Sequence, residues 1–185
     1  MDPCTRLLLA LLLVVPALAQ QTWVVDRLNR PGTHFTDLPA AYAAAAPGDI
    51  LQLRSTGTAI PWILYTPPPL IDKGVKIVGE HATPTPIIGG NLYIRNLPAA
   101  HTLVLAGLWF NPHYGASPSI GAQDNAGSIV FEQCKFGDRS CGSFGPNLWF
   151  TRCALVTFSQ CQLFCCGFAH RFEDCLLHAN DTEFR

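Results

Sequence analysis

Charged residues are scarce in this sequence. Asp, Glu, Lys and Arg make up 14% of the 185 residues, against about 25% in an average globular domain. Because Lys and Glu are good helix formers, their scarcity argues against an ordinary helical domain. The 12 basic and 13 acidic side chains give a net charge of −1, so we expect no basic surface for nucleic acid.

Long apolar runs are also missing. The run from Leu7 to Val15 is too short for a transmembrane helix, which needs about 20 apolar residues. Arg6 precedes this run and the small-residue sequence Ala17-Leu18-Ala19 follows it, which is the pattern of a secretory signal peptide. We therefore predict a signal peptide at residues 1–19, export to the medium, periplasm or cell surface, no membrane span, and one mature domain over 20–185.

A short phrase recurs four times between Ser128 and His178. Each copy has Phe in its third position and Cys three residues later, with two polar residues between them. The copies are IVFEQCKF (129–136), LWFTRCAL (148–155), VTFSQCQLF (156–164) and HRFEDCLL (170–177). Such recurrence is typical of the stacked coils of a solenoid.

Each copy predicts a short strand followed by a bend. Alternation along a strand turns Phe inward, and a one-residue bend would then turn the following Cys inward again. The same template fits LYIRNL (92–97) and LVLAGLWF (103–110), where Asn and Gly, which accept positive φ readily, occupy the bend. The predicted bend residues are Asn96, Gly107, Gln133, Arg152, Gln160 and Asp174.

The coil register is only partly specified by these copies. We expect Leu105, Phe131, Phe150 and Phe172 to occupy successive coils. The eight-residue step from Phe150 to Phe158 is too short for a coil, so these two residues are expected on different faces of one coil. The register within 148–164 stays open.

A helix is predicted at residues 36–46. Thr36 or Asp37 can cap it, and Pro47-Gly48 ends it. Its apolar face consists of Leu38, Ala41, Tyr42 and Ala45. We expect this helix to cover the open apolar end of the first coil.

The helix ends in Ala-Ala-Pro-Gly-Asp, and LIDKGVKIVGE (70–80) follows after one more strand and a loop. This order resembles the start of exported proteins of the pectin lyase-like superfamily, and the resemblance covers residues 22–178. It implies an all-β, right-handed parallel β-helix with a short N-terminal capping helix. The superfamily includes polysaccharide lyases, polygalacturonase-like hydrolases and surface proteins without known chemistry, so the fold alone does not select a function.

Three functions therefore stay open. We favour a non-catalytic extracellular module whose partner is a polysaccharide. The second hypothesis is a polysaccharide lyase or glycoside hydrolase, and the third is a structural or adhesive solenoid segment. Only HANDTEFR follows the last copy of the phrase, which predicts either a longer natural chain or self-association through an open C-terminal coil.

Candidate catalytic residues are two glutamates. Glu132 and Glu173 are expected in one outward column with Thr151 between them, about 10 Å apart, near the upper limit for an inverting glycosidase. The alternative is two solvated surface glutamates. No cofactor is predicted, although a lyase would need calcium. The carboxylates available for calcium are Asp124, Asp138, Asp174 and Asp181.

Candidate ligand-binding residues lie in the stretch from Asn111 to Gly127, which is expected to form an irregular insertion. They are His113, Tyr114 and Asp124. A second irregular stretch, Arg54 to Pro69, carries Trp62 and Tyr65. We expect Trp62 to pack this loop onto the coils.

The mature chain has seven cysteines. One hypothesis is a disulfide framework, which suits an exported protein. The other is that Cys134, Cys153 and Cys175 fill inward slots as small apolar residues, while Cys141, Cys165 and Cys166 pair or react. Cys165 and Cys166 also lie near His170 and His178, but the spacing does not suit zinc, and no metal site is predicted.

Overall fold

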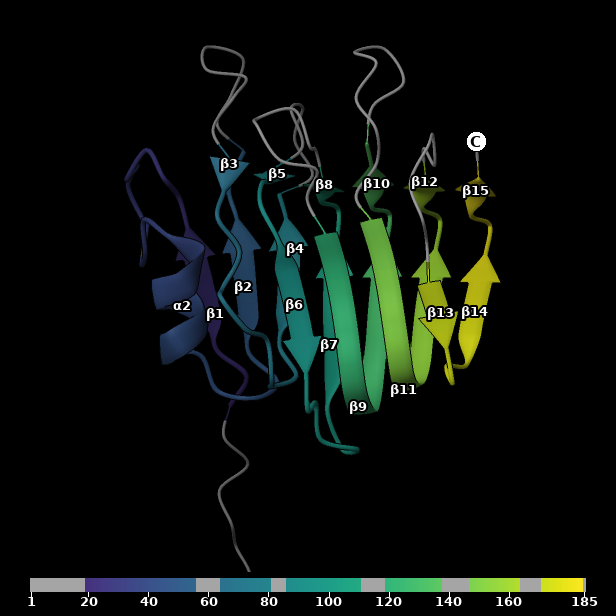
Figure 1. The fold of residues 1–185 in the computed structure, drawn as a ribbon. Helices are drawn as coiled ribbons and strands as arrows, with labels where there is room; N and C mark the ends of the chain where they lie inside the picture. Colours follow the sequence, from purple (N-terminus) through teal and green to yellow (C-terminus); the bar gives the residue numbers. More distant parts are fainter. Residues whose placement is uncertain are drawn as a thin grey trace, which may run out of the picture.

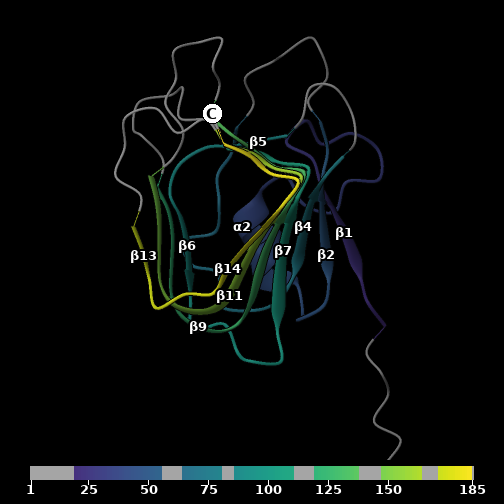
Figure 2. The ribbon, with the colours of Figure 1, turned by 90° about the vertical axis from the view of Figure 1, so that its right-hand side faces the viewer.

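The computed structural model describes residues 19–55, 64–80, 86–110, 119–137, 147–163 and 171–184. The chain winds into a parallel β-solenoid of about four turns, so the predicted all-β parallel β-helix is confirmed (Figure 1). Viewed along the axis, successive coils lie over one another (Figure 2). The predicted signal peptide falls almost entirely outside the described residues.

The strands form three faces, and the third face begins at β6. The first face consists of β1 (Thr22–Val25), β2 (Ile50–Leu53), β4 (Lys76–Gly79), β7 (Thr102–Ala106), the ends of β9 (Ser119–Glu132) and β11 (Asn147–Ser159), and β14 (Leu177–Asn180). The second face consists of β3 (Leu64–Tyr65), β5 (Ile87–Ile88), β8 (Trp109–Phe110), β10 (Lys135–Phe136), β12 (Gln162–Leu163) and β15 (Glu183–Phe184). The third face consists of β6 (Leu92–Arg95), the starts of β9 and β11, and β13 (Arg171–Glu173).

Positive φ angles occur at two corners of the coils from β6 onward. All six predicted bend residues have them, from 49° at Asp174 to 60° at Gly107. Two further bends, at Asp124 and Asp181, were not predicted. The corner between the third and first faces has Asn96, Asp124, Arg152 and Asp174, and the corner between the first and second faces has Gly107, Gln133, Gln160 and Asp181.

Phenylalanines stack along each face of the interior. Phe131 and Phe158 stack on the first face with ring centroids 5.0 Å apart. Phe150 and Phe172 stack on the third face at 5.6 Å. On the second face, the stacked pair at 5.0 Å is Phe110 and Phe136. The stacks meet edge to face, as Phe131 does with Phe136 at 5.5 Å, a favourable aromatic geometry.

The predicted register is correct at two steps and wrong at one. Leu105 pairs with Phe131 and Phe150 pairs with Phe172, and Phe150 and Phe158 lie on different faces, as expected. The step from Phe131 to Phe150 is not one coil, because Phe131 pairs with Phe158. The partner of Phe150 in the previous coil is Ala122, which belongs to a strand segment without the repeated phrase.

Residues 119–127 belong to strand β9. The expected irregular insertion from Asn111 to Gly127 is therefore wrong in its second half, because this segment supplies the third-face strand of its coil. His113 and Tyr114 lie outside the described residues, as does Trp62.

The helix α2 (Leu38–Ala44) lies at the start of the solenoid, as predicted (Figure 1). Asp37 caps it by accepting a hydrogen bond from the Ala40 N–H at 2.8 Å. Tyr42 fixes α2 to the coil of β4, because its hydroxyl accepts the backbone N–H groups of Asp72 and Lys73 at 2.8 and 3.1 Å. The predicted apolar face, Leu38, Ala41, Tyr42 and Ala45, is buried.

The cysteines of the phrase point inward. Cys134, Cys153 and Cys161 are buried and Cys175 is half-buried, all four as free thiols. The predicted inward position is thus confirmed for Cys134, Cys153 and Cys175. Cys141, Cys165 and Cys166 lie outside the described residues.

The last described coil leaves apolar side chains uncovered. Phe172, Leu176 and Leu177 are 43%, 65% and 41% exposed. No helix among the described residues is long and apolar enough to cross a membrane.

The Phe131→Ala variant tests the inward stacks. Phe131 is fully buried, so we expect its truncation to lower the free energy of unfolding by about 3–5 kcal/mol, measured by urea denaturation. Phe172→Ala is the control, because Phe172 stacks similarly but is partly exposed, and it should cost about 1–2 kcal/mol. Equal losses in the two variants would contradict the described core.

Candidate functional site

Two aromatic rings lie on the outward side of the third face. Tyr93 on β6 and Trp149 on β11 alternate with the inward residues Ile94 and Phe150. The ring centroids lie 6.2 Å apart with planes inclined by 51°. Tyr93 is 39% exposed, so the pair forms an aromatic platform open to solvent.

The platform depends on Gly121. Strand β9 lies between β6 and β11, and Gly121 pairs with both Tyr93 and Trp149. A Cβ atom at Gly121 would lie 2.0 Å from Cζ2 of Trp149, so the indole covers the space that any side chain would occupy. The absence of a side chain lets two rings from non-adjacent strands meet.

Ion pairs extend the platform toward the corner. Arg95, two residues after Tyr93 and on the same side of β6, has Nη2 at 3.8 Å from Oδ2 of Asp124. Arg152 Nε lies 2.5 Å from Oδ1 of the same carboxylate. The hydrogen bond from Arg152, followed by the charges of Arg152 and Arg95, lowers the pKa of Asp124. The same hydrogen bond raises the pKa of Arg152.

A groove of about 430 Å³ runs beside these ion pairs. Its lining residues are Asp124, Asn125, Ala126, Arg152, Cys153, Ala154 and Asp174. The buried side chain of Asn125 holds the corner from inside, accepting the Leu97 N–H at 2.9 Å and donating to the Ile94 carbonyl at 3.1 Å. The platform, the ion pairs and the groove together are called the third-face site below.

The sequence-predicted residues are distributed unevenly around this site. Asp124, a predicted ligand-binding residue, lies at its centre. Glu173 lies on the third face, where it pairs with Thr151. Glu132 lies on the first face and pairs with Ser159. The predicted column of Glu132, Thr151 and Glu173 is therefore wrong, because β9 and β11 each turn the corner and carry strands of two faces.

Sequence reasoning missed Tyr93 and Trp149. Both occupy the same slot of the repeated phrase, immediately before the inward residue, in LYIRNL and LWFTRC. That slot points outward by strand alternation. An aromatic residue there is the signal that could have identified the platform.

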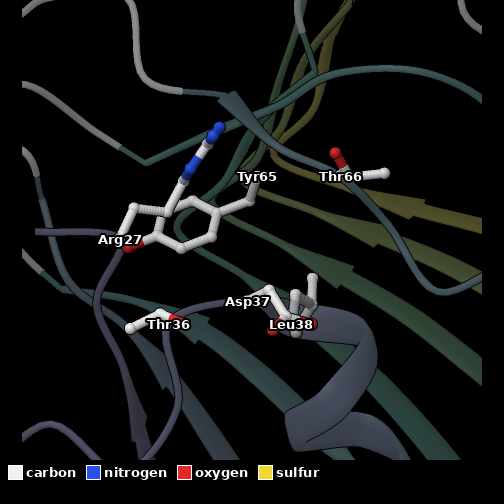
Figure 3. Close-up of a pocket in the computed structure, with 6 residues that line it drawn as sticks. All are labelled: Arg27, Thr36, Asp37, Leu38, Tyr65 and Thr66. Carbon is white, nitrogen blue, oxygen red and sulfur yellow. The ribbon is translucent and has the colours of Figure 1, made fainter. Parts of the chain in front are cut away.

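A second hollow of about 340 Å³ lies at the start of α2 (Figure 3). Its principal polar groups serve the fold. The Tyr65 hydroxyl donates toward the carbonyls of Val25 and Arg54, at 3.2 and 2.8 Å, and burial raises the pKa of Tyr65 to about 12. Asp37 caps α2. This hollow is therefore a weaker candidate than the third-face site.

Metal-ligating side chains do not cluster in the described parts of the chain, since no three His, Cys, Asp or Glu residues there could hold one ion. Of the four aspartates considered for calcium, Asp124, Asp174 and Asp181 occupy bends. Asp138 lies outside the described residues.

Comparison with known proteins gives no family assignment: no protein-family model, curated protein or solved structure matches the chain.

The pKa of Asp124 tests the ion pairs. We expect its carboxyl to titrate below the usual 3.8 in a carbon-detected NMR titration, and Arg152→Gln to raise that pKa. Because the folded-state pKa is lowered, this carboxylate stabilises the fold at neutral pH, and the contribution disappears as pH falls through the folded-state pKa. Arg171→Gln is the control, since Arg171 pairs with Glu173 at 2.7 Å. An unchanged pKa in Arg152→Gln would contradict the described contact.

Proposed function

We propose that this protein is an exported, non-catalytic β-solenoid module that binds carbohydrate through the third-face site. The observation that carries the proposal is the contact of exposed Tyr93 with half-buried Trp149, beside the Arg95–Asp124 ion pair. One face of a pyranose ring is apolar and stacks on an aromatic ring. Arginine and carboxylate groups at the rim suit sugar hydroxyls, and arginine also suits uronic acid carboxylates.

The fold supports this proposal in part. A parallel solenoid that follows a short helix agrees with the order of elements in the pectin lyase-like superfamily, and the leader-like pattern at residues 1–19 supports export. Membership of that superfamily, and the right-handed winding that it implies, are parts of the proposal.

The placement of the glutamates favours binding over hydrolysis. A glycosidase needs two carboxylates that flank one scissile bond, about 5–9.5 Å apart. Glu132 and Glu173 lie on different faces. We therefore prefer a binding module to the rival lyase or hydrolase, which would use these residues and calcium.

Self-association is a second candidate function, favoured by the last described coil. Strands β13 and β14 each pair with β11 on one side, and Leu176 beside them is 65% exposed. The opposite end of the solenoid is occupied by α2. We therefore propose that the last described coil pairs edge to edge with the same coil of a second copy.

Glycan binding is tested with the mature chain from Gln20. A glycan array, with and without calcium, identifies the ligand, and calorimetry then gives Kd. We expect Trp149→Ala and Tyr93→Ala each to raise Kd at least about tenfold, because an aromatic anchor is lost. Gly121→Ala should also weaken binding while keeping both rings, since its Cβ displaces the indole.

Trp109→Ala is the matched control, because Trp109 lies on the second face, beneath Lys135. Its Kd should equal that of the parent, with thermal denaturation confirming that each variant is folded. Binding that survives Trp149→Ala would contradict the site. New reducing ends or unsaturated products from the bound glycan would replace the binding module with the rival enzyme.

Association of two copies is tested by sedimentation equilibrium over a range of concentrations. Leu176→Lys should raise the dimer Kd about tenfold or more, because it places a charge in the contact. Leu70→Lys is the control, since Leu70 is a similarly apolar residue, 40% exposed, outside the last coil. A parent chain that stays monomeric, or equal effects of the two substitutions, would reject this second function.

A further inference from the structure

The residue after each bend points inward, and cysteines occupy this position in neighbouring coils. At the corner between the third and first faces, Cys153 contacts Asn125 of the previous coil and Cys175 of the next coil. At the corner between the first and second faces, Cys161 occupies the position of Cys134 in the next coil, because the residues after them, Lys135 and Gln162, pair with each other. The solenoid therefore builds two pairs of stacked thiols, one at each corner.

Cys153 and Cys175 are in direct contact. The Cys153 backbone N–H lies 3.3 Å from Sγ of Cys175. Each thiol also donates to the carbonyl two residues earlier in its own strand, Thr151 at 3.6 Å and Glu173 at 3.0 Å. Stacked strands lie about 4.8 Å apart, and disulfides span Cα separations of about 4.4–6.8 Å. The general spacing of stacked strands therefore falls within the range of Cα separations that disulfides span.

Exposure distinguishes the two pairs. Cys134 and Cys161 are each 1% exposed, and Cys153 is 2% exposed. Cys175 is half-buried, at the edge of the last described coil. Cys153 also lines the groove of the third-face site. A reagent in solution can therefore reach Cys175, whereas neither thiol of the Cys134–Cys161 pair is accessible.

We propose that Cys153 and Cys175 form a disulfide that fastens the last described coil to the coil before it, with a small disulfide such as oxidised glutathione as the oxidant. The proposal does not rest on carbohydrate binding, although Cys153 lines the groove of the third-face site. Cys134 and Cys161, although stacked in the same way, stay reduced.

The exchange proceeds in two steps. The Cys175 thiolate attacks one sulfur of oxidised glutathione, so that its disulfide bond breaks, a mixed disulfide forms and one glutathione thiolate leaves. The Cys153 thiolate then attacks Sγ of Cys175 and releases the second glutathione. The two protein sulfurs are oxidised, the two glutathione sulfurs are reduced, and the protons of the protein thiols pass to the departing thiolates.

Burial makes the second step slow at neutral pH. Burial is the largest cause that raises the pKa of Cys153, to about 11, so little thiolate is present at pH 7. The rate of the second step should rise about tenfold per pH unit between pH 7 and 9, in proportion to the thiolate. The mixed disulfide at Cys175 should accordingly accumulate at pH 7 and disappear faster at pH 9.

The strands of this coil gain most from the bond. Strands β13 and β14 pair with β11 alone among the described strands. The disulfide closes a loop between residues 22 positions apart, which limits the freedom of the opened coil. Backbone amides in 171–180 should therefore exchange at least about tenfold more slowly in the oxidised protein.

The experiment treats the folded mature chain with oxidised glutathione and maps peptides by mass spectrometry without reduction. We expect a peptide that joins Cys153 to Cys175, with the Cys134 and Cys161 peptides still reduced. Cys153→Ala should stop at a stable glutathione adduct on Cys175, and Cys175→Ala should prevent both the adduct and the cross-link. Alanine keeps the buried slot apolar, and hydrogen exchange checks that each variant is folded.

Three results would overturn the proposal. One is a parent chain in which Cys175 keeps its glutathione at pH 9, since Cys153 then does not reach it. A second is a cross-link between Cys134 and Cys161 that forms first, and a third is a Cys175 thiol that does not react. Other disulfides that involve Cys141, Cys165 or Cys166 are distinguished by their peptides.

Discussion

The arrangement of the strands depends on a one-residue bend with positive φ. It occurs at two corners of the coil, and each occurrence turns the chain from one strand into the next while keeping the following side chain inside. Backbone sterics make this conformation costly for most residues. Its repetition at equivalent positions keeps the strands of successive coils in register, which aligns the phenylalanine stacks within and the polar side chains outside. The core and the third-face site are consequences of the same local geometry.

The bends and inward residues could be predicted because they depend on local chemistry. A segment of six or eight residues is enough to recognise the inward Phe and the bend residue that tolerates positive φ. The register between Phe131 and Phe150 could not be predicted in this way. Its true partner is Ala122, an inward residue too small to mark a copy of the phrase, so the third-face strand of β9 was not recognised.

Asp124 was predicted as part of a site, but for an incomplete reason. It was expected in an irregular loop, and it lies instead at a bend, where Arg95 and Arg152 from the neighbouring coils reach it. The platform could not be predicted from any one segment, because Tyr93 and Trp149 belong to coils that are separated by a third. Their contact depends on the register and on the missing side chain of Gly121. Only an alignment of all three coils would bring these residues together.

The helix at the start makes the two ends of the solenoid unequal. Tyr42 fixes α2 to the coil of β4, and Asp49 binds the N–H groups of Gln21 and Ala46 at 2.9 Å each. In a stack of coils, each unit is stabilised only by its neighbours. The coils that contact α2 therefore have a second source of stability, in addition to strand pairing. The third-face site lies on β6, β9 and β11, away from the strands that contact the helix, so its geometry depends on strand pairing and side-chain packing alone.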